Sequence, residues 1–152
     1  MERTLVIVKP DGVQRGLISE VLGRFERRGF RLVALKLIAI DRDLAERHYS
    51  VHAGKFFYNS LVDYISSGPV VVAVVEGPDA IRVVRAMVGS TRPAEATPGT
   101  IRGDFCLTGL RNLIHASDAP ETALSEIENF FRPEEVLSYS RDIDRWLLES
   151  AE

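Results

Sequence analysis

The chain has 152 residues, 45% of them hydrophobic, and a net charge of −3. The charge argues against nucleic acid as a partner, and the hydrophobic fraction excludes a disordered chain. We expect a single domain over residues 1–152 and no membrane span, because no run approaches roughly 18 apolar residues. The single cysteine, Cys106, cannot form an internal disulfide. With no targeting pattern at the N-terminus, this predicts a cytoplasmic protein.

Short apolar runs bounded by Gly, Pro or Asp predict four strands. They cover residues 4–8, 30–40, 70–75 and 113–114. The first run is almost continuously apolar, which is typical of a strand that is buried on both faces.

Apolar residues at helical spacing predict helices between these strands. The helices are expected at residues 18–29, 44–50 and 57–66, after Gly77-Pro78, and after Asp118, which is predicted to cap the last one. The resulting order favours an α/β (α+β) sandwich with a ferredoxin-like sheet, and a small doubly wound sheet is the alternative.

A polar loop over residues 89–103 is long for a compact domain, and such loops are usually functional or disordered. The sequence has no P-loop, no dinucleotide fingerprint and no protein-kinase motif, so any phosphate contact must come from side chains. Candidate phosphate ligands are Lys9, Arg85, Thr91, Arg92, Arg102 and Arg111. The competing interpretation is that these are ordinary solvated charges.

His115 ends the fourth apolar run and precedes a predicted helix. A neutral histidine is a nucleophile near physiological pH, although a structural histidine at a strand end fits the pattern equally well. Taken alone, Glu126 is typical of an exposed carboxylate. His48 and His52 belong to no motif and are predicted to be surface residues.

Three longer stretches resemble the nucleoside diphosphate kinases. They are Asn-Leu-Ile-His-Ala-Ser-Asp at 112–118, Val-Lys-Pro-Asp-Gly-Val-Gln-Arg-Gly-Leu at 8–17 and Pro-Gly-Thr-Ile-Arg-Gly-Asp-Phe at 98–105. Two shorter ones, at 67–72 and 131–135, follow the family in order. The similarity runs from about Arg3 to Trp146.

The resemblance implies a ferredoxin-like sandwich with a four-stranded antiparallel sheet covered by helices. It implies transfer of the γ-phosphate of ATP or another nucleoside triphosphate to a nucleoside diphosphate. The expected route is ping-pong, through a phosphohistidine on His115. Mg²⁺ is expected to arrive with the nucleotide and to be held mainly by its phosphates.

Further roles are implied position by position. Residues matched to the catalytic machinery besides His115 are Lys9, Tyr49, Asn112, Ser117 and Glu126, the last two as the pair that orients the histidine. Residues matched to nucleotide binding are Lys9, Lys55, Phe57, Leu61, Arg85, Thr91, Arg102 and Asn112. Phe57 stacks on the base in this scheme, which predicts broad base specificity because every base has a π face.

Some positions depart from the family pattern. Lys55-Phe56 stands where Arg-Pro is usual, and lysine lacks the planar fork of arginine. Ala116 replaces a glycine, which puts any special backbone angle there in doubt. Gly109-Leu110 replaces Val-Gly, so an apolar contact to the base is in doubt as well.

Two other functions compete with this interpretation. One is a catalytically silent nucleotide-binding relative, and the other is a ferredoxin-like RNA-binding module, whose aromatic strand motif is missing. The family forms homo-oligomers through the Arg92-Pro93 loop and the tail after Ser138. The length of the tail predicts a hexamer, with a tetramer as the alternative.

Overall fold

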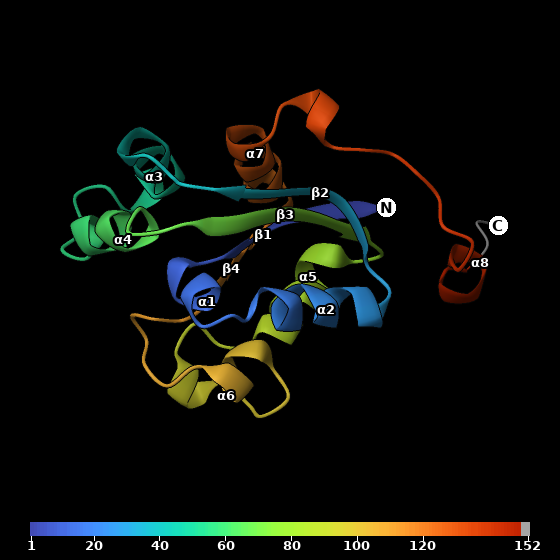
Figure 1. Ribbon diagram of the computed structural model, residues 1–152, viewed down its shortest axis with the longest axis horizontal. Helices are drawn as coiled ribbons and strands as arrows, with labels where there is room; N and C mark the ends of the chain where they lie inside the picture. The colour runs from blue at the N-terminus through green and yellow to red at the C-terminus, as the bar shows by residue number, and fades with distance from the viewer. Residues whose placement is uncertain (150–152) are drawn as a thin grey trace.

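The computed structural model describes residues 1–149 and contains a four-stranded sheet in the order β2-β3-β1-β4 (Figure 1). The strands are β1 (Glu2–Val8), β2 (Arg31–Ile38), β3 (Val70–Gly77) and β4 (Ile114–Ala116). Every neighbouring pair is antiparallel. The predicted ferredoxin-like sandwich is therefore confirmed, and the doubly wound alternative was wrong.

Helices cover both faces of this sheet (Figure 1). One layer consists of α3 (Arg42–His48), α4 (Tyr58–Ile65) and α7 (Pro120–Phe130). The other consists of α1 (Pro10–Gln14), α2 (Ile18–Arg28), α5 (Ala80–Val88) and α6 (Ile101–Phe105). Short 3₁₀ turns lie at Ser50–His52, Pro93–Glu95 and Pro133–Glu135.

Strand β1 lies between the two cores, as its apolar sequence predicts. Leu5 and Ile7 pack into the α3/α4/α7 side, whereas Val6 and Val8 pack into the α2/α5/α6 side. Because successive side chains of a strand point to opposite faces, a strand between two helical layers must be apolar throughout.

Two predicted helix starts were wrong. Helix α7 begins at Pro120 with Ala119 at its N-cap and no side-chain cap, so neither Ser117 nor Asp118 caps it. The Ser117 hydroxyl instead accepts a hydrogen bond from the Leu5 amide (3.2 Å), because β4 ends beside β1. Helix α5 starts at Ala80, after Asp79 in the left-handed conformation, rather than at Gly77-Pro78.

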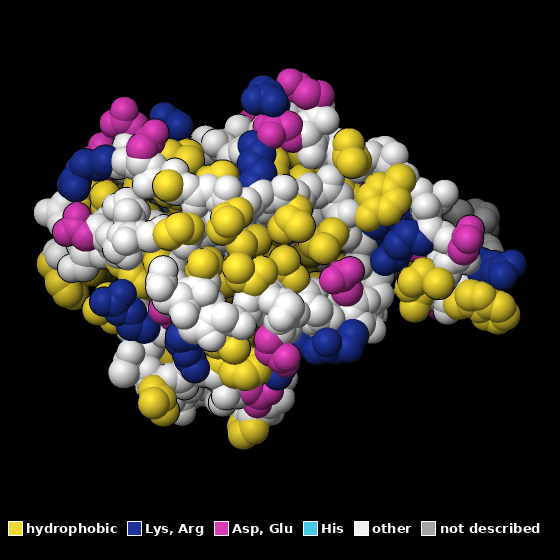
Figure 2. Space-filling view, viewed as in Figure 1, with side chains coloured by type: hydrophobic (Ala, Val, Ile, Leu, Met, Phe, Trp, Pro, Cys, Tyr) yellow, Lys and Arg dark blue, Asp and Glu magenta, His cyan; other side chains and the backbone are white. Residues whose placement is uncertain are grey.

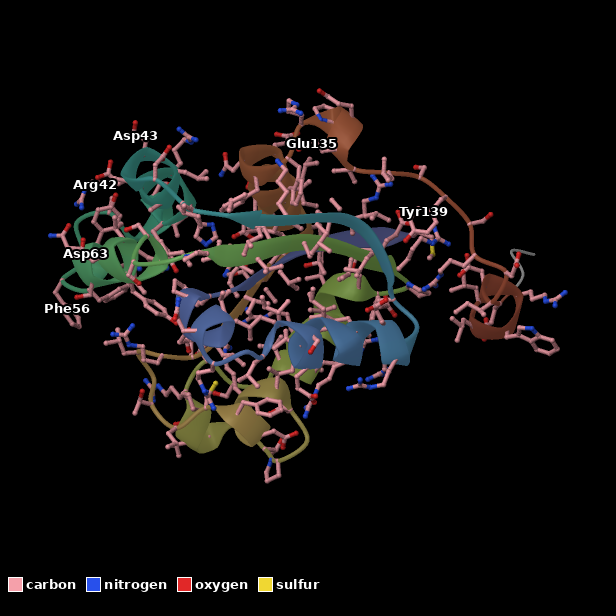
Figure 3. The ribbon with its side chains drawn as sticks, viewed as in Figure 1. Arg42, Asp43, Phe56, Asp63, Glu135 and Tyr139 are labelled. Atoms are coloured by element: carbon pink, nitrogen blue, oxygen red, sulfur yellow. The ribbon has the colours of Figure 1, made fainter. Side chains whose placement is uncertain are left out.

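The chain after α7 runs along the edge of the molecule to α8 (Asp144–Leu147), which lies away from the sheet (Figure 1). Tyr139 donates a hydrogen bond to the Leu32 carbonyl, which holds this tail against β2 (Figure 3). Trp146 remains 79% exposed. No helix within residues 1–149 is both long and apolar enough to cross a bilayer.

Two phenylalanines test where the core lies. The Phe25 side chain is fully buried in the α2/α5/α6 core, whereas Phe56 is 97% exposed and projects from the connection between α3 and α4 (Figure 3). We expect Phe25→Ala to lower the free energy of unfolding by about 3–5 kcal/mol, and Phe56→Ala by less than about 0.5 kcal/mol. Denaturant unfolding measures both, and equal losses would contradict the assigned core.

Candidate functional site

The site is built where the end of β1 meets β4. His115 pairs with Ile7 across the two strands. One step further, the Lys9 amide donates to the Leu113 carbonyl (2.8 Å), and the Lys9 ammonium donates to Asn112 Oδ1 (2.8 Å). Leu113 has φ +73°, a strained angle for a branched residue, and strain of this kind is characteristic of functional sites.

Glu126 of α7 lies directly behind His115. His115 Nε2 and Glu126 Oε2 are 2.6 Å apart, and the glutamate side chain is only 8% exposed. Burial raises the pKa of Glu126, but the contact with His115 outweighs it, so that the pKa is lowered overall. The glutamate is therefore a buried carboxylate, not the exposed one that the isolated residue suggested.

The two ring nitrogens of His115 have different surroundings. Nε2 is buried and faces Glu126. The side chain as a whole is 23% exposed and borders a cavity of about 580 Å³. A proton on Nε2 would face the carboxylate and leave Nδ1 with a free lone pair, which is the state that a nucleophile needs.

Ser117, the second predicted orienting residue, lies next to this pair. Its hydroxyl is hydrogen-bonded to the backbone of Leu5. It also helps to lower the pKa of Glu126. Ser117 therefore acts on the pair through Glu126 and is held by β1, while Glu126 contacts the histidine itself.

The prediction that His48 is a surface residue was wrong. His48 is the last residue of α3, its side chain is 2% exposed, and its Nδ1 lies 3.4 Å from Glu126 Oε2. Its ring packs edge-to-face on His115 with 4.7 Å between the ring centroids. Helical spacing was the signal that could have found it, because Ala45 and His48 share the buried face of α3.

Tyr49 follows on the same side of the cavity. Its ring is buried and its hydroxyl has no hydrogen-bond partner. Burial, together with the negative charge of Glu126, raises the pKa of Tyr49 to about 12. The hydroxyl therefore stays protonated at neutral pH and is available as a donor.

Among the predicted phosphate ligands, Arg102 lies close enough to both Lys9 and Arg85 to repel them. Burial and the charge of Arg102 lower the pKa of Lys9 to about 8. Burial and the charge of Arg85 lower the pKa of Arg102 to about 10. A cluster of desolvated cations favours an anion that would relieve this repulsion.

The backbone around the site is tied together by two of these arginines. Arg102 donates to the carbonyls of Asn112 (3.1 Å), Gly89 (3.2 Å) and Ile114 (2.5 Å). Arg85 donates to the carbonyl of Ala116 (3.1 Å), which follows the histidine. The sequence did not indicate this second function for Arg102, which links α5, α6 and β4.

Several of the predicted nucleotide-binding residues lie at the cavity or next to a residue that borders it. Arg85 and Thr91 border the cavity, as does His52, and Asn112 Nδ2 reaches the Thr91 carbonyl (3.5 Å). Phe57 packs against His52 with 5.3 Å between the rings. The Leu61 amide donates to the Phe57 carbonyl (3.1 Å), and its partly buried side chain packs against the α3/α4/α7 core.

The exposed cations near the site have other neighbours. Lys55 Nζ lies 3.3 Å from His52 Nδ1 and sits over the Phe57 ring. Arg92 pairs with Glu95, and Arg111 lies over the Tyr64 ring. Neither of these two arginines borders the cavity.

Ala116 needs no special backbone angle. It pairs with Val6 in the sheet, and the non-glycine residues with positive φ among residues 1–149 are Asp79 and Leu113. An alanine therefore fits the strand as well as the glycine of the family pattern would.

The comparisons with known proteins agree with this geometry. The family model for nucleoside diphosphate kinase matches residues 2–136. A curated nucleoside diphosphate kinase from Thermomicrobium roseum is 61% identical over 148 residues, which are 97% of this chain and 99% of the relative. One from Archaeoglobus fulgidus is 56% identical over 149 residues, covering 98% and 99% of the two chains.

Solved structures give the same result. A nucleoside diphosphate kinase family protein from Babesia bovis superposes with a TM-score of 0.95 at 45% identity, covering 97% of this chain and all of that one. A halophilic nucleoside diphosphate kinase from Halobacterium salinarum in complex with CDP reaches 0.95 at 46% identity, with 97% and 99% coverage. The chain therefore belongs to the nucleoside diphosphate kinase family and has nucleoside diphosphate kinase activity.

Proposed function

We propose that the phosphoryl group passes through His115 in a ping-pong reaction. Nδ1 attacks the γ-phosphorus of a nucleoside triphosphate, the bond to the β–γ bridging oxygen breaks, and the diphosphate leaves. A second nucleoside diphosphate then attacks the phosphohistidine through its terminal phosphate oxygen, which restores the neutral histidine and yields the new triphosphate.

The observation that carries this proposal is the unequal environment of the two nitrogens of His115. Nε2 lies 2.6 Å from a buried carboxylate, while the ring borders the cavity. A negative Glu126 favours the proton on Nε2 and stabilises the positive charge that develops on the ring as Nδ1 bonds to phosphorus.

The cations support the phosphate roles. Phosphoryl transfer requires alignment and neutralisation of charge spreading over the phosphate oxygens. Arg102 repels Lys9 on one side and Arg85 on the other, and a bound triphosphate would relieve that repulsion. The Halobacterium relative binds CDP, and we propose that this chain takes nucleoside tri- and diphosphates in the same cavity.

Members of this family generally use Mg-nucleotides, and we propose that Mg²⁺ reaches the site on the phosphates. Among residues 1–149, the cluster that could hold a metal is His48, His115 and Glu126. Two of its three ligand atoms are nitrogens, whereas Mg²⁺ prefers oxygen. The chain's own residues therefore fit a metal that is carried by the nucleotide, where it would neutralise phosphate charge.

Labelling tests the nucleophile. After incubation with γ-labelled ATP, the protein should carry acid-labile, base-stable label that chases to added GDP. His115→Ala should abolish the label because no nucleophile remains, while His52→Ala should retain it at saturating ATP. Label that persists in the His115 variant would show that another residue is the nucleophile.

Base stacking on Phe57 predicts tolerance of all bases. Purine and pyrimidine diphosphates should be accepted at comparable rates. Phe57→Ala should raise KM for all of them, because it removes a stacking contribution of about 1–3 kcal/mol to nucleotide binding. Phe56→Ala, at the neighbouring 97% exposed ring, is the control and should change KM little. A strict preference for one base would contradict this model.

Lys9 gives the reaction a pH limit. Its pKa is lowered to about 8, so the ammonium is charged below that pH and loses its charge above it. We expect kcat/KM to fall as the pH rises through about 8, since this parameter reports groups of the free enzyme. Lys9→Arg keeps its charge and should move the fall to higher pH. An unchanged profile in that variant would exclude Lys9 as the cause.

We propose that the chain forms a homo-oligomer, a hexamer, with a tetramer as the alternative. Leu35 and Leu37 on edge strand β2 are 54% and 65% exposed, and Ile143 and Trp146 of the tail are exposed as well. Figure 2 shows hydrophobic side chains on this face and on α8. Such surfaces favour association.

Light scattering should give a mass about six times the 16.9 kDa of one chain. A mass of four chains would support the tetramer instead, and a monomer would contradict association. The cytoplasmic setting stays a prediction.

A further inference from the structure

His48 is a buried titratable group that the proposed reaction does not use. Both of its ring nitrogens are buried and have no hydrogen-bond partner of good geometry. Burying a polar ring without partners is unfavourable, so its position calls for an explanation. Its nearest polar atom is Glu126 Oε2, 3.4 Å from Nδ1.

Two imidazoles share this carboxylate oxygen. His115 Nε2 lies at 2.6 Å and His48 Nδ1 at 3.4 Å. The rings meet edge-to-face at an interplanar angle of 84°. The His48 ring thus packs against the His115 ring while its Nδ1 faces the same oxygen that His115 Nε2 contacts.

The electrostatics require His48 to be neutral. Its ring faces His115 on β4 and Glu126 on α7. The other titratable groups that act on it are Lys9, just after β1, and His52, on the adjoining 3₁₀ turn. The ring also packs against Tyr49. Burial, followed by the charge of His115, lowers the pKa of His48 to about 3. A charged His48 would compete with His115 for Glu126, whereas a neutral ring leaves the carboxylate to the nucleophile.

We propose that His48 is a positioning residue that, together with Glu126, holds the His115 ring so that Nε2 carries the proton and Nδ1 faces the phosphate. This inference rests on the proposed role of His115 as the nucleophile. Phe130 closes the other side of the His48 ring, with 5.6 Å between the centroids, so the two histidines are packed as a unit.

Three variants separate positioning from packing. His48→Leu keeps an apolar side chain but removes the polar nitrogen, and His48→Asn restores an N–H at the δ position. His52→Leu is the control at a histidine that borders the cavity without contacting Glu126. For each variant we would measure single-turnover phosphorylation by γ-labelled ATP, KM for GDP, the thermal midpoint, and the ¹⁵N NMR shifts of His115, which report its tautomer.

We expect His48→Leu to slow phosphorylation by about tenfold or more, by analogy with residues that orient a metal-ligating histidine. KM for GDP should stay within about twofold, and the ¹⁵N shifts should reveal a population with the proton on Nδ1. His48→Asn should recover most of the rate and the Nε2-protonated form. His52→Leu should leave the His115 shifts unchanged.

The inference is overturned if His48→Leu is phosphorylated at the wild-type rate, or if it loses rate with unchanged His115 shifts. It is also overturned if His48→Asn lowers rate and thermal midpoint as much as His48→Leu does, since that indicates packing alone. If His48→Leu does not fold, the ¹⁵N shifts and rate of His48→Asn decide. Failure of the proposed function is distinguishable, because the wild-type protein would then carry no label on His115.

Discussion

The contact between His115 and Glu126 is the interaction on which the rest of the site depends. A carboxylate buried to 8% exposure is unfavourable unless it is paired, and this one faces two imidazoles. Its position requires α7 to pack against β1 and β4 to follow the edge of β1. The fold therefore brings together, from distant parts of the chain, a histidine with one nitrogen occupied and one free.

The second component of the site is a local excess of positive charge. Burial and the charge of Arg102 lower the pKa of Lys9, and burial and the charge of Arg85 lower that of Arg102, in a chain whose net charge is −3. Arg102 also donates to three backbone carbonyls, and these contacts fix the position of its charge. A preorganised cluster of this kind needs little rearrangement when a phosphate binds. The global charge conceals this local excess.

Much of the fold followed from local patterns. The apolar run of β1 predicted burial on both faces, and the order of the elements predicted the sandwich. The predicted Asp118 cap of α7 was wrong because the helix begins at Pro120 with Ala119 at its N-cap. The adjacent Ser117 bonds to Leu5, a contact across 112 residues that no local signal encodes. For the same reason, the local sequence predicted that His48 and Glu126 would be exposed. Their burial depends on α3 and α7 meeting over β4, and only the family motif pointed to Glu126.

The most direct test of this account is the identity of the phosphorylated nitrogen. NMR of the labelled enzyme, before and after acid release, distinguishes phosphate on Nδ1 from phosphate on Nε2. Because Nε2 of His115 lies 2.6 Å from Glu126, the account predicts attachment at Nδ1 alone. Phosphate on Nε2 would contradict it, since that nitrogen would have to leave the carboxylate and turn into the cavity.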